Sequence, residues 1–407
     1  MNSQAALQSN DAGDETSVVT GLINRARAAM AEFEGADQAR VDEAVTALAW
    51  SIYEPARAKE LAETAVIDTG LGNVESKIIK NQRKTFGCLR DLMRVKTVGI
   101  IEELPEKGLV KYAKPVGVVA AIAPSTNPSA TPVNKAMFAI KGRNAVIVAP
   151  SPAGLNTTTQ TCNYMRAELE KIGLPTDLVQ VLPAPVNKQL TQQLMIQSDL
   201  VVCTGSQNNV RRAYSSGTPA IGVGAGNVPV IIDTTADLLD AAENIMLSKC
   251  FDNATSCSSE NSVTILEDVY EDAIKALEAV GGYRCTPEDK QKVQDTLWEG
   301  GHLNRHVIAK DPDVFAATCG LPEDAKLAKF FLVEDELQVG KESPFSNEKL
   351  SLALTVYKAK DFAEAKRHVQ SVLDFAGMGH SVGIHTKDQV HASELAEDLR
   401  VVRVLVN

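Results

Sequence analysis

The residue in this chain best suited to covalent chemistry is a cysteine in a short polar segment. Cys257 stands between Thr255, Ser256, Ser258 and Ser259. Small polar neighbours leave a thiol open to a substrate, and their backbone N–H groups can stabilise charge that develops beside it. The ordinary alternative is a lone cysteine that fills a gap in an apolar core. A helical pattern over 238–250 and a strand pattern over 261–266 flank the segment, so we expect Cys257 on the loop between them.

Three other segments could contact a ligand. Asn127 follows a strand pattern, and its amide could donate to a ligand oxygen, although Asn before Pro is also ordinary turn chemistry. Gly205 and Ser206 stand between a strand and a helix, where glycine lets the backbone approach a phosphate and a helix N-terminus favours an anion. Gly224 lies in the glycine-rich segment 221–227, which suits close packing near a cofactor or a plain turn.

Alternating strand and helix patterns must position these residues. Strands are predicted over 116–123, 145–149, 178–182, 200–203 and 228–232, with helices over 133–141, 154–172, 187–197 and 207–215. Short apolar strands separated by helices indicate an α/β protein with a doubly wound parallel sheet, whose ligand lies at the carboxyl ends of the strands. No GxGxxG follows the first strand, so the usual dinucleotide fingerprint is absent.

The rest of the chain predicts two domains and a tail. Residues 1–17 are polar and predict a loose tail, helical patterns follow over 18–32 and 38–69, and residues 111–123 read as extended. A second alternating unit has predicted strands at 261–266, 329–333, 350–357, 380–385 and 401–406 and a helix at 268–280. We therefore expect a cofactor-binding domain over 18–228 and an α/β catalytic domain over 229–407.

Composition excludes several classes of protein. The net charge of −11 argues against nucleic acid and anionic membranes as partners. The seven cysteines form no CxxC pair, so we expect neither a metal site nor a disulfide framework. The start of the chain lacks a signal-peptide core and no run is long enough to span a membrane, which favours a cytoplasmic protein.

Read in order, five segments resemble the aldehyde dehydrogenase superfamily, and above all its CoA-acylating branch. They are KPVGVVAAIAPSTNP, VVCTGS, SSGTPAIGVGAGNVPVIID, FDNATSCSSENS and EKLSLAL, and the resemblance runs from about residue 18 to residue 407. It implies the family's fold, a cofactor-binding and a catalytic domain with an extended oligomerisation segment. It also implies oxidation of a small aldehyde with NADP or NAD and coenzyme A, giving an acyl-CoA.

The resemblance also implies a role for each site residue. Cys257 matches the thiol nucleophile, and Asn127 the amide that, with the backbone N–H of Cys257, stabilises the oxyanion. Glu348 matches the carboxylate that holds the nicotinamide ribose; without the resemblance it would read as a solvated surface residue. The remaining cofactor-binding positions are Pro124, Ser125, Ser151, Gly205, Ser206 and Gly224.

Two departures from the hydrolytic members of the family bear on the reaction. Val223 stands where those enzymes carry the glutamate that activates water, and valine cannot be a general base. A thiol needs less activation than water, so this position favours acyl transfer to coenzyme A. Residues 149–152 read Ala-Pro-Ser-Pro and hold no carboxylate to repel a 2′-phosphate, so NADP is permitted and NAD stays possible.

The substrate and the assembly are less constrained. The hydroxyl-rich segment around Cys257 is most similar to that of the acylating sulfoacetaldehyde dehydrogenases, with acetaldehyde or another short aldehyde as the alternative. His380 lies where related enzymes also carry histidine, and a structural role is favoured over a catalytic one. The segment 97–116 resembles the family's oligomerisation segment, which implies a homodimer or homotetramer. The family continues beyond residue 407, so a truncated, binding-only relative is the other interpretation.

Overall fold

The computed structural model describes residues 3–336 and 339–407, with the backbone alone over residues 3–13. The chain forms two compact units. Unit 1 contains the residues up to Gly70 and Val74–Gly224, and unit 2 contains Leu71–Asn73 and Ala225–Asn407. The chain thus passes from unit 1 to unit 2 between residues 224 and 225, close to the expected domain boundary at 228/229.

Unit 1 is built on a parallel sheet in the order β5-β4-β3-β6-β7. Its strands are β3 (Val118–Ile122), β4 (Ala145–Ala149), β5 (Val179–Val181), β6 (Leu200–Thr204) and β7 (Ala220–Val223). The connecting helices are α6 (Ala130–Lys141), α7 (Leu155–Lys171), α8 (Lys188–Gln197) and α9 (Gln207–Tyr214). The strand order reverses direction between β3 and β6, which is the topological switch point of a doubly wound sheet. The predicted fold class is confirmed.

The N-terminal helices of unit 1 differ from the sequence prediction in two places. They are α1 (Ser3–Phe33), α2 (Gln38–Tyr53), α3 (Pro55–Thr69), α4 (Val74–Ile79), a π-helix (Lys80–Lys84) and α5 (Thr85–Leu92). The pattern over 38–69 is two helices, because Pro55 starts α3 and the Glu54 carboxylate caps it. The predicted loose tail is helical from Ser3, since no proline interrupts the stretch and a helix anchored by buried Val19 and Ala26 can propagate. Helix α1 has 31 residues but is too polar to cross a bilayer, and no other helix in the described residues could do so.

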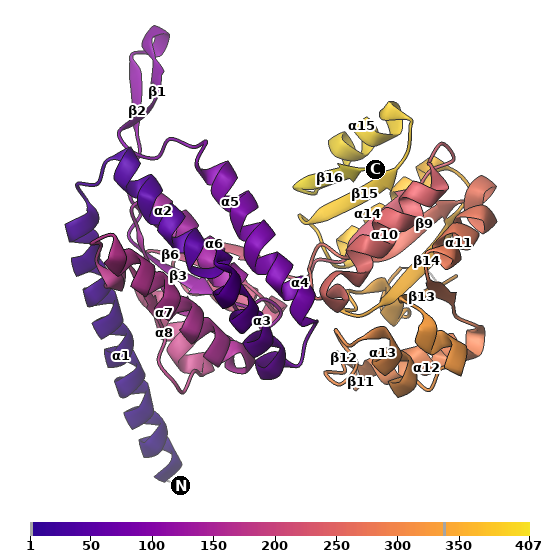
Figure 1. The fold of residues 1–407 in the computed structure, drawn as a ribbon, viewed down its shortest axis with the longest axis horizontal. Helices are drawn as coiled ribbons and strands as arrows, with labels where there is room; N and C mark the ends of the chain where they lie inside the picture. Colours follow the sequence, from indigo (N-terminus) through magenta and orange to yellow (C-terminus); the bar gives the residue numbers. More distant parts are fainter. Residues whose placement is uncertain (1–2, 337–338) are drawn as a thin grey trace. The chain divides into compact units, whose positions relative to one another are not determined.

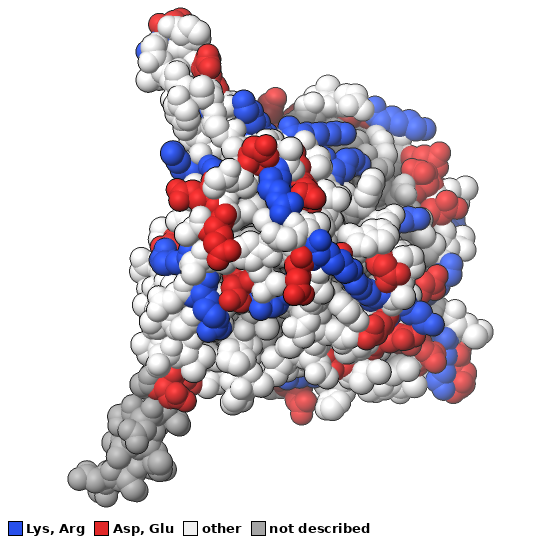
Figure 2. Space-filling model, turned by 60° about the vertical axis from the view of Figure 1, so that its left-hand side comes forward, with Lys and Arg blue, Asp and Glu red and all other residues white. Residues whose placement is uncertain are grey.

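A two-stranded hairpin projects from unit 1 (Figures 1 and 2). It pairs β1 (Ile100–Leu104) with antiparallel β2 (Leu109–Tyr112). The extended run predicted over 111–123 is therefore two strands, β2 and β3, separated at Pro115, which cannot donate to a sheet. The exposed side chains of the β1–β2 hairpin include Ile101, Leu109, Val110 and Tyr112, so the hairpin presents an apolar surface.

Unit 2 is built on a second parallel sheet in the order β10-β13-β14-β9-β8-β15-β16. Its strands are β8 (Val228–Ile232), β9 (Glu260–Leu266), β10 (Gly282–Arg284), β13 (Phe330–Glu334), β14 (Ala353–Ala359), β15 (Ser381–His385) and β16 (Arg403–Val406), with a small hairpin of β11 (Trp298–Glu299) and β12 (His302–Leu303). The helices are α10 (Leu238–Cys250), α11 (Tyr270–Ala279), α12 (Pro287–Leu297), α13 (Pro312–Thr318), α14 (Phe362–Phe375) and α15 (Gln389–Asp398).

One strand was assigned to the wrong sheet. The run 228–232 is grouped with the strand patterns of the first sheet, although the expected boundary at 228/229 falls before it; β8 pairs with β9 and β15 in the second sheet. The place beside β6 belongs to β7, whose sequence is typical of a turn because Gly222 lies within it and Gly224 and Gly226 follow it.

Candidate active site

The loop that carries Cys257 begins with three residues in the left-handed region. Asp252, Asn253 and Ala254 have φ values of 51°, 51° and 62°. Such backbone costs roughly 1–3 kcal/mol per non-glycine residue, so the surroundings must hold it. The Asp252 carboxylate accepts hydrogen bonds from the Asn73 N–H at 2.9 Å and the Thr255 hydroxyl at 2.5 Å. These contacts fix a tight turn between α10 and β9 directly before Cys257.

Exposure separates Cys257 from the other cysteines. Cys162, Cys203, Cys285 and Cys319 are buried, and Cys88 and Cys250 are partly buried, whereas Cys257 is exposed. Burial raises the pKa of Cys250 to about 11 and that of Cys162 to about 12. Because the thiolate is the reactive form, burial makes these thiols poor nucleophiles. Cys257 is therefore the cysteine best placed for covalent chemistry.

The backbone of Gly226 packs directly against Cys257. A Cβ atom on Gly226 would lie 2.0 Å from the carbonyl oxygen of Cys257 and 2.7 Å from its Cβ. Gly226 also donates its N–H to Oε1 of Glu348 at 3.1 Å. Three segments that precede the neighbouring strands β8, β9 and β14 thus meet, which brings Glu348 and the cysteine loop to the same glycine.

The Glu348 carboxylate lies in a partly buried, charged environment. Burial raises its pKa, while the Gly226 N–H and the ammonium groups of Lys349 and Lys249 oppose that rise. Lys349 is fully buried and donates to the backbone carbonyls of Phe345 and Asn347, both at 2.9 Å. Glu348 is thus held by its neighbours and is not the freely solvated glutamate that an isolated reading suggests.

Unit 1 gathers the other predicted residues at the carboxyl end of its sheet. Pro124, Ser125 and Asn127 follow β3, Ser151 follows β4, and Gly205 and Ser206 follow β6. Strands β4 and β6 are the two neighbours of β3, so these segments flank the switch point, where doubly wound sheets bind dinucleotides. Ser206 caps α9, and Gly205 has φ 153°, a conformation that favours glycine.

The loop carrying Asn127 is anchored at its far end. The Pro128 carbonyl accepts a hydrogen bond from Thr158 at 2.8 Å, and the Ser129 hydroxyl donates to the Asn81 side chain at 2.6 Å. Asn127 itself is only partly buried. Its amide is therefore carried by a fixed backbone and remains accessible from the carboxyl end of β3.

Two further predicted positions lie at the end of β7. The Val223 side chain is 43% exposed, and as a hydrocarbon it can neither accept nor donate a proton. A Cβ atom on Gly224 would lie 2.4 Å from the Gln207 side chain, so Gly224 allows the β7 end to approach the start of α9. Gly224 thus lies beside the Ser206 turn.

His380 lies in unit 2 and donates its backbone N–H to the Gly377 carbonyl at 3.1 Å, at the end of a turn whose first residues contact Asn227. A Cβ atom on Gly377 would lie 3.1 Å from Asn227, and the Asn227 amide donates to the Ala376 carbonyl at 3.2 Å. Burial lowers the pKa of His380, so its neutral form is favoured. The structural role predicted for His380 stays a prediction.

The residues that sequence reasoning missed are those that support the site. In the sequence, Gly226 stands out only as one member of a glycine-rich segment, and Lys249, Lys349 and Asp252 belong to no motif that predicts a role. A lysine in the last turn of a helix normally reads as solvated, so its burial has no local signal. The run Asp-Asn after Phe251 carries a weak signal, since these residue types tolerate left-handed backbone.

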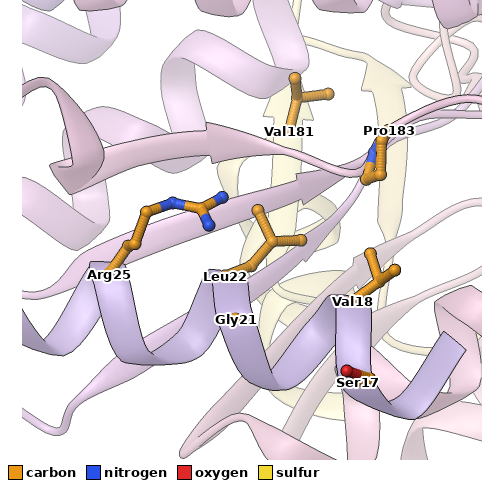
Figure 3. A pocket seen from close by; sticks show the side chains of 7 residues that line it. All are labelled: Ser17, Val18, Gly21, Leu22, Arg25, Val181 and Pro183. Atoms are coloured by element: carbon orange, nitrogen blue, oxygen red, sulfur yellow. The ribbon is translucent and has the colours of Figure 1, made fainter. Parts of the chain in front are cut away.

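A cavity of about 420 Å³ lies elsewhere, between α1 and the end of β5 (Figure 3). Val18, Leu22 and Arg25 line it from α1, and Val181 and Pro183 face them. None of the predicted site residues contributes to it.

Comparison with known proteins matches this geometry to one family. The aldehyde dehydrogenase family model matches residues 5–293. An acylating sulfoacetaldehyde dehydrogenase of Cupriavidus necator is 50% identical over 403 residues, covering 99% of this chain and 82% of the relative. Another, from Bilophila wadsworthia, is 45% identical over 395 residues, with 95% and 84% covered. The crystal structure of an acetylating aldehyde dehydrogenase from Geobacillus thermoglucosidasius superposes with a TM-score of 0.91 at 36% identity, over 97% of this chain and 87% of that one.

Proposed function

Because the chain belongs to the aldehyde dehydrogenase family, we propose that it oxidises a small aldehyde to an acyl-CoA through a thioester on Cys257. The observation that carries this proposal is the exposed Cys257 thiol, on a strained turn packed against Gly226, which also binds Glu348. The names of the acylating relatives support acyl transfer as the second half of the reaction.

Cys257 and Asn127 have separate roles in the first half-reaction. The Cys257 thiolate adds to the aldehyde carbon, and the resulting alkoxide accepts hydrogen bonds from the Asn127 amide and the Cys257 backbone N–H. Donors aimed at such an oxyanion are typically worth about 3 kcal/mol each. An oxidised nicotinamide cofactor, when bound, supplies the acceptor for the hydride that leaves this carbon. Loss of hydride leaves an acyl thioester on Cys257.

The second half-reaction discharges that thioester. Val223 provides no carboxylate to activate water, so a nucleophile that needs less activation has the advantage. The thiol of coenzyme A meets this need, and its attack frees the Cys257 thiolate. The acyl-CoA and the free Cys257 thiolate are therefore formed without a general base at position 223.

The unit 1 residues fit a dinucleotide. The open backbone at Gly205, the capped start of α9 at Ser206 and the turns at Pro124, Ser125 and Ser151 suit a diphosphate and its ribose. Gly224 allows close packing beside them, and Glu348 is the carboxylate suited to the nicotinamide ribose. No acidic side chain stands at Ser151 or Pro152, so we propose that NADP is accepted, with NAD as the alternative.

Sulfoacetaldehyde is the substrate that we favour. Two relatives at 50% and 45% identity carry that activity in their names. The loop around Cys257 offers hydroxyl donors to an anionic tail, and the buried Ser259 hydroxyl lacks a hydrogen-bond partner among the described residues. Acetaldehyde is the second candidate, because the acetylating enzyme from Geobacillus is 36% identical.

A panel of aldehydes tests the proposal. Reduction of NADP and of NAD is measured with sulfoacetaldehyde and with acetaldehyde, each with and without coenzyme A. We expect sustained turnover only with coenzyme A, and the higher kcat/KM with sulfoacetaldehyde. Equal sustained rates without coenzyme A would reject the reaction type, and a preference for acetaldehyde would reject the substrate.

We also propose that the β1–β2 hairpin joins subunits into a homodimer or homotetramer and that the protein works in the cytoplasm. Exposed Leu109, Val110 and Tyr112 form an apolar surface of the kind that marks an interface. All seven cysteines are present as thiols, as expected of a reducing compartment. Light scattering should give a smaller particle for Val110→Asp than for the unmodified chain.

A further inference from the structure

The segment between α3 and α4 leaves unit 1 for three residues. Leu71–Asn73 belong to unit 2, although α3 before them and α4 after them belong to unit 1. Gly72 donates its N–H to the Ala309 carbonyl at 2.9 Å, and its backbone is left-handed with φ 72°. A Cβ atom on Gly72 would lie 1.9 Å from Oδ1 of Asp252, so glycine is needed for this close approach. The segment is therefore packed against the turn that precedes Cys257.

Asn73 makes two hydrogen bonds with that turn. Its backbone N–H donates to Oδ1 of Asp252 at 2.9 Å, and its side-chain Nδ2 donates to Oδ1 of Asn253 at 3.3 Å. Asp252 and Asn253 are both buried, and both have left-handed backbone with φ 51°. Asn73 thus binds the side chains of the two residues that begin the turn.

Left-handed backbone is concentrated around these contacts. Seven non-glycine residues among those described have positive φ, and five of them are Asp252, Asn253, Ala254, Ala309 and Leu350. Hydrogen bonds join the five, because Nδ2 of Asn253 donates to the Ala309 carbonyl at 3.4 Å and the Ala309 N–H donates to the Leu350 carbonyl at 2.8 Å. Such backbone persists only where the surroundings hold it, and it gathers at functional sites. The strained residues therefore form one network, which includes the turn before Cys257.

The orientation of the Asn253 amide makes Asn73 a required donor. Nδ2 of Asn253 donates to Oδ1 of Asp311 at 2.8 Å. An ionised carboxylate can only accept, so this contact fixes which end of the amide faces Asp311. Oδ1 of Asn253 then faces Asn73, and a buried acceptor is costly when it has no donor. The amide of Asn73 supplies that donor.

We propose that Asn73 is a positioning residue, whose amide and N–H hold Asn253 and Asp252 in the left-handed turn that presents the Cys257 thiol to the substrate. This inference rests on the proposed function, since it concerns the thiol that attacks the aldehyde. Asn73 acts on that thiol only through the turn, and Asp311 fixes the amide through which it acts.

Asn73→Asp tests the donor with little change of size. The variant keeps the backbone N–H but turns a carboxylate oxygen toward Oδ1 of Asn253, so that two acceptors face each other. We expect the turn to move and kcat to fall by roughly tenfold to a hundredfold, because a misplacement of about 1 Å typically costs about a hundredfold. The dissociation constant of NADPH should stay the same, because Asp252 and Asn253 are not among the predicted cofactor-binding residues.

A second substitution should reverse this loss. In the double variant Asn73→Asp, Asp311→Asn the donor and the acceptor exchange sides, so the Asn253 amide can rotate by half a turn. Its Nδ2 then donates to the carboxylate at position 73, and its Oδ1 accepts from the amide at position 311. We expect the double variant to recover most of the lost kcat. Asp311→Asn alone should have little effect, because the new amide can present its own oxygen to Asn253.

The experiment measures kcat, the dissociation constant of NADPH and the rate at which iodoacetamide alkylates Cys257, after urea titration has shown that each variant is folded. If Asn73→Asp does not fold, Asn73→Ala removes only the side-chain donor and carries the same expectation for kcat. Asn187→Asp is the matched control, because a carboxylate can also cap α8 by accepting from the Leu190 N–H, and it should leave kcat unchanged.

The possible failures can be told apart. Unchanged kcat and alkylation in Asn73→Asp, or a double variant no more active than Asn73→Asp, would overturn the inference about Asn73. A fully active Cys257→Ala variant would instead reject the proposed function, and that result does not depend on Asn73.

Discussion

Replacing Gly226 with alanine should disable the site without unfolding the protein. The added Cβ would lie 2.0 Å from the Cys257 carbonyl oxygen, whereas Cβ atoms essentially never approach within 3.0 Å of another heavy atom. The obstructing atoms belong to the Cys257 backbone, so the cysteine loop must move by about 1 Å. A misplacement of about 1 Å in a reacting group typically costs around a hundredfold in rate, or about 2.7 kcal/mol of barrier.

The assay compares kcat/KM for the aldehyde with the rate at which iodoacetamide alkylates Cys257. We expect Gly226→Ala to lower kcat/KM about a hundredfold and to change the alkylation rate, while NADPH still binds. Gly35→Ala is a matched control, because a Cβ atom there meets nothing within 4 Å. A Gly226→Ala enzyme with kcat/KM within threefold of the unmodified chain would refute the packing argument.

Three further substitutions test other parts of the site. Asn127→Ala should slow acylation of the enzyme by about a hundredfold, since one oxyanion donor is lost, and should leave cofactor affinity unchanged; unaltered burst kinetics would count against it. Val223→Glu should add a water-activating carboxylate, so that free carboxylic acid forms without coenzyme A. Product analysis that finds no free acid would contradict this expectation. Asp252→Ala removes the acceptor of the Asn73 N–H and of the Thr255 hydroxyl and should lower the free energy of unfolding by about 1–3 kcal/mol in urea titration; an unchanged midpoint would contradict that.

The fold could be predicted from the sequence because its pattern is local. Strands such as β4 and β8 are short apolar runs between helical patterns, and their observed bounds match the prediction. The pairing of β8 could not be predicted in this way, because a buried parallel strand looks the same in either sheet. Strand β7 was missed for the opposite reason, since its glycine disguises a strand as a turn.

Some residues of the candidate site could likewise be predicted from the sequence, and others could not. Cys257, Asn127 and Glu348 stand in recognisable segments, so their types and order pointed to a reaction. Lys249 donates to the Glu260 carbonyl, whereas Gly226 donates to Glu348 and packs against Cys257, and nothing in their immediate neighbours marks either residue. Contacts between segments far apart in the chain are fixed by packing, which a single sequence does not display.

The thioester on Cys257 is tested most directly by the mass of the enzyme during a single turnover. The protein is mixed with sulfoacetaldehyde and NADP in the absence of coenzyme A, digested, and analysed by mass spectrometry before and after coenzyme A is added. We expect an acyl group on the peptide that contains Cys257, stable until coenzyme A releases it as acyl-CoA. An unmodified Cys257, or an adduct that hydrolyses equally fast without coenzyme A, would contradict it.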